Sequence, residues 1–166
     1  MSFVFEPISK SGIHKMVNRF IREINVGVDR KERTQIAVDE TVVKIQGHLC
    51  FVWAAVDIHT KELIAVDVSA GRSELDCRFF LAKIKSKCVG KLPIIITDRG
   101  PWYNCVQDTG FDHWYNTFSI RNSVERFFRY LKERTRVFCN NINGTFRCLT
   151  IFVKLFSFLY RMLRGG

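Results

Sequence analysis

Ile94-Ile95-Ile96-Thr97-Asp98-Arg99-Gly100, which follows Leu92-Pro93, is the stretch that decides the predicted fold. Three consecutive isoleucines between Pro93 and Gly100 predict a short, fully buried strand. Asp98 comes where that strand should end, so a rigid element would aim its carboxylate. Taken alone, Asp98 is more typical of a turn aspartate. Two further carboxylates, Asp39 and Glu125, shift the balance toward a functional site.

The residues around this stretch predict a mixed sheet. Three runs rich in β-branched and apolar residues precede it, and the short connections between them indicate an antiparallel meander. A further short strand is expected near Trp114. The three runs cover residues 35–43, 49–57 and 63–68.

Helical patterns separate and follow these strands. A helix is expected over 73–86, with Ser73 as its cap and with Leu75, Phe79, Ala82 and Ile84 as its apolar residues. Two more helices are expected over 122–136 and 145–164. This order predicts an α/β fold of the ribonuclease-H-like kind, in which helices flank a mixed sheet.

The first 33 residues are interpreted as a separate unit. Apolar residues between Ile13 and Ile24 recur at helical spacing, so a helix is expected over 8–24, and the charged segment 27–33 reads as a linker. This helix could be the recognition helix of an abbreviated helix-turn-helix, or simply a packing helix. The domain prediction is therefore 1–33 for the helix and linker and 34–166 for one α/β domain.

Composition favours a folded protein with a polyanionic partner. The chain of 166 residues is 47% hydrophobic and carries a net charge of +10. Residues 121–166 hold 10 basic and 2 acidic side chains, so they contribute +8 of this charge. The six cysteines form no C-x-x-C pair, no secretory signal is visible and no stretch is long enough for a membrane span. A cytoplasmic, nucleoid-associated protein is expected.

The predicted helix 122–136 combines one acid with a row of bases. At 100° per residue, Arg129, Lys132 and Arg136 fall within about 40° of Glu125. An apolar stripe on a separate face can pack on the sheet, and it comprises Val124, Phe127, Phe128 and Leu131. A Glu–Arg pair at this spacing is also a common surface feature.

Metal chemistry accounts for the whole set better. Asp39, Asp98 and Glu125 could together hold two divalent cations about 4 Å apart, and oxygen ligands suit Mg²⁺ or Mn²⁺. One ion would activate a water or a DNA 3′-hydroxyl, and the other would stabilise the leaving oxygen of a phosphodiester. The bases that follow Glu125 would bind the flanking phosphates, and these are Arg129, Lys132 and Arg136.

Three segments resemble the DDE transposases of bacterial and archaeal insertion sequences, which belong to the retroviral-integrase superfamily. The segments are Val38-Asp39-Glu40-Thr41, residues 97–103 and residues 121–136, and the resemblance covers roughly residues 34–145. It implies a ribonuclease-H-like fold, with Asp39, Asp98 and Glu125 as the metal-binding triad, and it suggests that Lys132 contacts DNA. Two departures from the family are the abbreviated N-terminal region and the short interval between Asp98 and Glu125.

The leading hypothesis is therefore a transposase that cuts and joins DNA strands with Mg²⁺ or Mn²⁺, working as a homo-oligomer on element ends and target DNA. The alternative is a DNA-binding transposase remnant without catalysis. A nuclease acting on RNA–DNA hybrids is a third, weaker hypothesis. The target site, the element ends, the oligomeric state and the activity of this copy do not follow from the sequence.

Overall fold

The part of the chain described by the computed structural model runs from residue 28 to 115, from 122 to 135, over 141–142 and from 144 to 164. It also includes five separate residues, Ser9, Ser11, Gly12, Lys15 and Arg19. Most of the predicted helix 8–24 therefore lies outside the described residues, as does the predicted DNA-binding residue Arg136. The role proposed for residues 1–33 stays a prediction.

The predicted meander is confirmed. Strands β1 (Gln35–Ile45), β2 (His48–Asp57) and β3 (Leu63–Ser69) pair antiparallel in that order. Gln46 and Gly47 connect β1 to β2 with φ angles of 48° and 83°. Two central residues with positive φ are typical of the tight hairpin turn that matches strand twist, and Gly47 adopts this conformation without steric cost.

The isoleucine stretch forms β4 (Ile94–Thr97), which pairs parallel with β1. The predicted strand near Trp114 is β5 (His113–Tyr115), which pairs parallel with β4. The strand order is β3-β2-β1-β4-β5, and the short β6 (Asn141–Ile142) pairs with the far end of β1. The short 3₁₀ helices η1 (Pro101–Cys105) and η2 (Gln107–Thr109) lie between β4 and β5. The mixed sheet predicted from the sequence is thus present.

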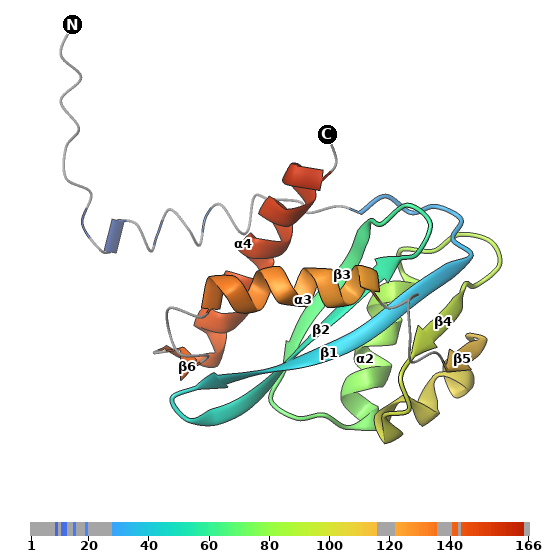
Figure 1. Ribbon diagram of the computed structural model, residues 1–166, viewed down its shortest axis with the longest axis horizontal. Helices are drawn as coiled ribbons and strands as arrows, with labels where there is room; N and C mark the ends of the chain where they lie inside the picture. Colours follow the sequence, from blue (N-terminus) through green and yellow to red (C-terminus); the bar gives the residue numbers. More distant parts are fainter. Residues whose placement is uncertain are drawn as a thin grey trace, which may run out of the picture.

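Helices cover both faces of this sheet (Figure 1). On one face, α2 (Glu74–Lys85) buries Phe80 and Leu81 against Ile36 and Trp53. On the other face, α3 (Asn122–Thr135) and α4 (Phe146–Arg164) share a core with the alternate residues of β1. That second core includes Ala37, Val43, Phe127, Leu131 and Val153. Because neighbouring residues of β1 face opposite ways, each side of the strand serves a different core.

The predicted cap of α2 is correct, but three of its four predicted apolar residues, Leu75, Phe79 and Ala82, are exposed. Ser73 and Asp76 form a reciprocal capping box, in which each side chain accepts from the other residue's backbone N–H. Leu75 and Phe79 are 60% and 62% exposed. The buried face instead follows the i, i+3, i+4, i+7 spacing of Cys77, Phe80, Leu81 and Ile84. None of the helices in the described ranges has the length and apolar character that crossing a membrane requires.

A buried ion pair joins the ends of the meander. The Arg33 guanidinium donates to Asp57 Oδ2 at 3.1 Å and to Glu62 Oε2 at 3.0 Å, and its side chain is fully buried. Asp57 also accepts from the backbone N–H groups of His59 and Thr60. Burial raises the pKa of Asp57, but these backbone donors and Arg33 outweigh it, so the pKa lies below its ordinary value. Asp57 therefore has a structural role.

Replacing Arg33 with Met should lower the free energy of unfolding by about 3–5 kcal/mol, because the Asp57 carboxylate would stay buried without its cation. Chemical denaturation measures this. Lys31→Met is the matched control, since Lys31 makes a partly exposed pair with Glu62 and should contribute about 1 kcal/mol or less. Equal losses in the two variants would contradict the structural role. The lowered pKa of Asp57 also means that its contribution is present above about pH 4 and is lost as the pH falls.

Candidate active site

The register between β1 and β4 places Asp39 and Asp98 next to each other. Ala37 pairs with Ile96, and Asp39 and Asp98 each follow two positions later. Residues two apart on a strand share a face, and Ala37 belongs to the core beneath α3 and α4. β4 ends at Thr97, whereas β1 continues to Ile45. Asp39 therefore lies where β1 loses its neighbour, on the α3 side of the sheet.

Hydrogen bonds orient both carboxylates. Asp39 is only 7% exposed, and its Oδ1 accepts from the backbone N–H of Glu40 at 3.0 Å. Asp98 is half-buried, and its Oδ1 accepts from the backbone N–H of Gly100 at 2.9 Å. Asp98 thus makes the turn contact typical of an aspartate before glycine, and it does so from the end of a buried strand.

Helix α3 brings the third predicted carboxylate to the same face of the sheet. Its buried stripe is the predicted one, Val124, Phe127, Phe128 and Leu131. Its polar side borders a cleft of about 530 Å³ against β1. The cleft is lined by Asp39, Glu40, Thr41, Glu125, Phe128, Arg129, Lys132 and Glu133. Asp39, Glu125, Arg129 and Lys132 therefore meet at one cleft, and Asp98 follows the adjacent strand without lining it.

The donor set fits a hard divalent cation by its chemistry, because every predicted ligand is a carboxylate. Within the described residues, no group of three or more Asp, Glu, His or Cys side chains is close enough to hold a metal ion. The structure therefore brings the three carboxylates to one face without gathering them around one point. Two other acids of the sheet form ion pairs, Asp57 with Arg33 and Asp67 with Lys83.

Glu40, the neighbour of Asp39, has a role that the sequence prediction missed. Its nearly buried carboxylate accepts from the Tyr103 hydroxyl, from Trp102 Nε1 at 3.3 Å and from Arg72 at 3.3 Å. The Arg72 guanidinium lies 3.8 Å from the centre of the Trp102 ring. These contacts tie η1, which begins three residues after Asp98, to β1. They fix the chain that follows Asp98 against the strand that carries Asp39.

Tyr103 lies near three acids, Glu40, Asp39 and Asp98, whose charges affect its pKa. Burial raises its pKa well above the ordinary value, and the negative charges of Glu40, Asp39 and Asp98 raise it further. Tyr103 therefore stays a neutral donor. Trp102 and Tyr103 follow Asp98 closely in the sequence, and the polar N–H and O–H groups on these aromatic side chains were the signal that could have indicated this network.

Sequence comparisons relate this chain to known proteins. Residues 33–151 match a protein-family model described as a DDE domain. An uncharacterized protein of Methanocaldococcus jannaschii is 34% identical over 164 residues, which cover 97% of this chain and 76% of that protein. An uncharacterized protein of Aquifex aeolicus is 34% identical over 67 residues, which cover 36% of this chain and 55% of that protein.

Solved structures share the fold at low sequence identity. The catalytic core domain of BIV integrase aligns with a TM-score of 0.54 at 14% identity, covering 75% of this chain and 80% of that chain. The HTLV-2 integrase catalytic core domain in complex with magnesium gives 0.51 at 14% identity, covering 81% and 87%. A simian T-cell lymphotropic virus intasome chain gives 0.57 at 18% identity, covering 80% and 50%. The sheet and its helices therefore form the ribonuclease-H-like fold of integrase cores.

Proposed function

Because this chain belongs to the DDE transposases of the integrase and ribonuclease-H-like superfamily, we propose that it catalyses metal-dependent cleavage and strand transfer of DNA. One observation carries the proposal. The cleft between β1 and α3 combines the carboxylates of Asp39 and Glu125 with the cations of Arg129 and Lys132, beside the strand that Asp98 directly follows. A cleft that holds both acids for metal and bases for phosphate suits a phosphodiester substrate.

In this proposal, Asp39, Asp98 and Glu125 would hold Mg²⁺ or Mn²⁺ in the two-ion arrangement common to phosphodiester chemistry. Bound ions would supply the activation of the attacking oxygen and the neutralisation of the leaving one. Asp39 and Asp98 would act as the fixed side of the site, since strand pairing and backbone hydrogen bonds orient them. Glu125 would be the adjustable side, since its exposed side chain lines the cleft from a helix.

The bases of α3 would position the DNA. Arg129 and Lys132 are exposed and line the cleft. Arg129 lies about one helical turn beyond Glu125, and Lys132 lies about two turns beyond it. Their charge would bind phosphates on either side of the reacting one, and Arg136 would extend the row by another turn. We further propose that the protein works as a homo-oligomer on DNA and associates with the nucleoid, because strand transfer joins separate DNA segments.

Glu125→Gln should abolish cleavage and strand transfer while leaving DNA affinity unchanged or slightly higher. The substitution removes a ligand needed in the transition state together with one negative charge that faces DNA. The test is a Mn²⁺-dependent cleavage and strand-transfer assay on candidate element ends, with binding measured on the same duplex. Glu133→Gln is the matched control, because Glu133 lines the same cleft from the same helix.

If the Glu125→Gln variant cleaves normally and the Glu133→Gln variant does not, Glu133 and not Glu125 is the third metal ligand. An unmodified protein that binds element ends but neither cuts nor joins them would favour the alternative, a DNA-binding protein without catalysis. Circular dichroism of each variant checks that the domain is folded.

Lys132→Ala should weaken DNA binding and reduce the slope of log affinity against log salt by about one, because one phosphate contact is lost. Fluorescence anisotropy at several salt concentrations measures both quantities. Lys44→Ala removes the same charge from the exposed far end of β1 and should leave the slope nearly unchanged. The same reduction in both variants would mean that Lys132 contributes only net charge.

A further inference from the structure

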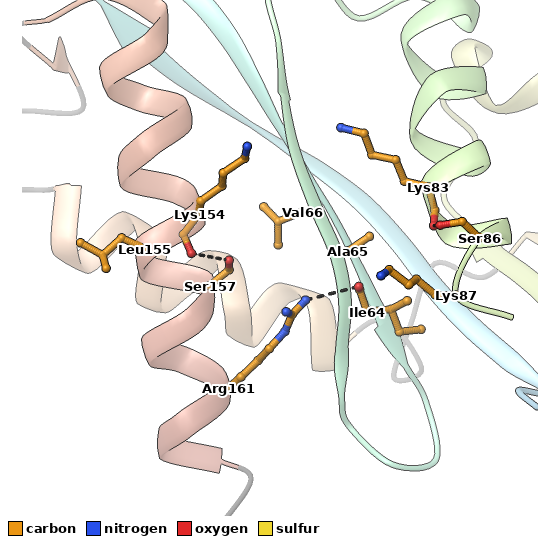
Figure 2. Close-up of a pocket in the computed structure, with 10 residues that line it drawn as sticks. All are labelled: Ile64, Ala65, Val66, Lys83, Ser86, Lys87, Lys154, Leu155, Ser157 and Arg161. Atoms are coloured by element: carbon orange, nitrogen blue, oxygen red, sulfur yellow. Dashed lines mark hydrogen bonds between the residues drawn. The ribbon is translucent and has the colours of Figure 1, made fainter. Parts of the chain in front are cut away.

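A second basic cavity lies at the edge of the sheet away from the cleft. It has a volume of about 310 Å³ and borders β3, the terminal strand, between α2 and α4 (Figure 2). Lys83, Ser86 and Lys87 reach it from the end of α2, and Lys154, Ser157 and Arg161 reach it from α4. Cations from helices on opposite faces of the sheet thus converge at its edge.

Hydrogen bonds anchor one of these cations to the edge strand. Arg161 Nε donates to the carbonyl oxygen of Leu63 at 2.8 Å, and its Nη2 donates to that of Ile64 at 3.3 Å. Burial lowers the pKa of Arg161 to about 10, so the guanidinium is still charged at neutral pH. Arg161 covers backbone groups that an edge strand would otherwise expose, and it leaves positive charge at the cavity.

Two lysines add positive charge that nearby acids do not neutralise. Asp67 pairs with Lys83, and Glu62 pairs with Lys31 and Arg33. Across the described ranges, no carboxylate lies within ion-pair distance of Lys87 or Lys154. The cavity therefore favours an anionic ligand.

The bases of α4 extend this charge along a line. Arg147, Lys154 and Arg161 are seven residues apart, so they fall within about 40° of one another around the helix and about 10 Å apart along it. Arg147 and Lys154 are exposed, while the buried stripe of α4, which includes Leu149, Val153 and Tyr160, lies elsewhere on the helix. A line of charge about 20 Å long fits an extended polyanion better than a single small anion.

We propose that this cavity and the basic row of α4 (Arg147, Lys154 and Arg161) bind the phosphate backbone of DNA outside the catalytic cleft. This proposal rests on the proposed function. Asp39, Ala54 and Val66 are successive partners across the sheet, so β3 lies about 10 Å from β1, on the side away from β4. The phosphates bound here are therefore not those at the reacting bond. They belong to a flanking part of the same duplex or to the second duplex that strand transfer requires.

The test compares two double variants of the full chain. Lys87→Gln with Lys154→Gln removes two charges from the cavity and keeps Arg161, which supports β3. Lys44→Gln with Lys91→Gln removes two charges from exposed lysines that do not line it. DNA affinity is measured by fluorescence anisotropy across a salt series, cleavage is assayed on the same duplex, and circular dichroism confirms folding.

The cavity variant should bind about tenfold more weakly, and its slope of log affinity against log salt should fall by about two, while the control variant stays near the unmodified protein. Indistinguishable slopes in the two variants, with cleavage intact, would overturn the cavity proposal and leave the proposed function standing. An unmodified protein that does not bind or cut DNA would instead overturn the proposed function. Tighter binding of polyglutamate than of DNA, lost in the cavity variant, would assign the cavity to an acidic protein segment.

Discussion

The parallel pairing of β4 with β1 is the constraint on which the candidate site depends. The register that joins Ala37 to Ile96 determines that Asp39 and Asp98 follow on one face of the sheet, although 58 residues separate them in the sequence. A shift by one residue would turn one carboxylate into the opposite core. The three isoleucines favour this register, because Ile95 and Ile96 are both fully buried, Ile95 in the core that α2 shares.

The adjacent acids Asp39 and Glu40 lie on opposite faces of β1 and have different roles. Asp39 lines the cleft beneath α3. Glu40 is nearly buried and is held by Arg72, Trp102 and Tyr103, so it connects the strand to the segment after Asp98. A buried carboxylate with three donors is a stiff support, and it helps to hold the fixed side of the site in place. The adjustable side comes from α3, which packs on the sheet through its apolar stripe.

Local patterns predicted the elements of this fold well. The hairpin runs, the capping box at Ser73 and the apolar stripe of α3 each follow from a few neighbouring residues, and the structure has all of them. The prediction for the buried side of α2 was wrong for Leu75, Phe79 and Ala82 and correct only for Ile84. Leu75 and Phe79 are as apolar as Phe80 and Leu81, so the sequence pattern does not distinguish them. Only the packing partner decides which of these side chains is buried. Strand order and the Glu40 network depend on contacts between residues about 60 apart, so local patterns carried no signal for them.

The proposed function requires that Asp39, Asp98 and Glu125 form one metal site. Crystals grown with Mn²⁺ and measured by anomalous diffraction test this requirement most directly, because the metal is located without reference to activity. We expect Mn²⁺ to be bound by carboxylate oxygens of Asp39 and Asp98, with Glu125 completing the site from α3. An anomalous peak elsewhere, or no peak at these carboxylates in crystals saturated with Mn²⁺, would contradict it.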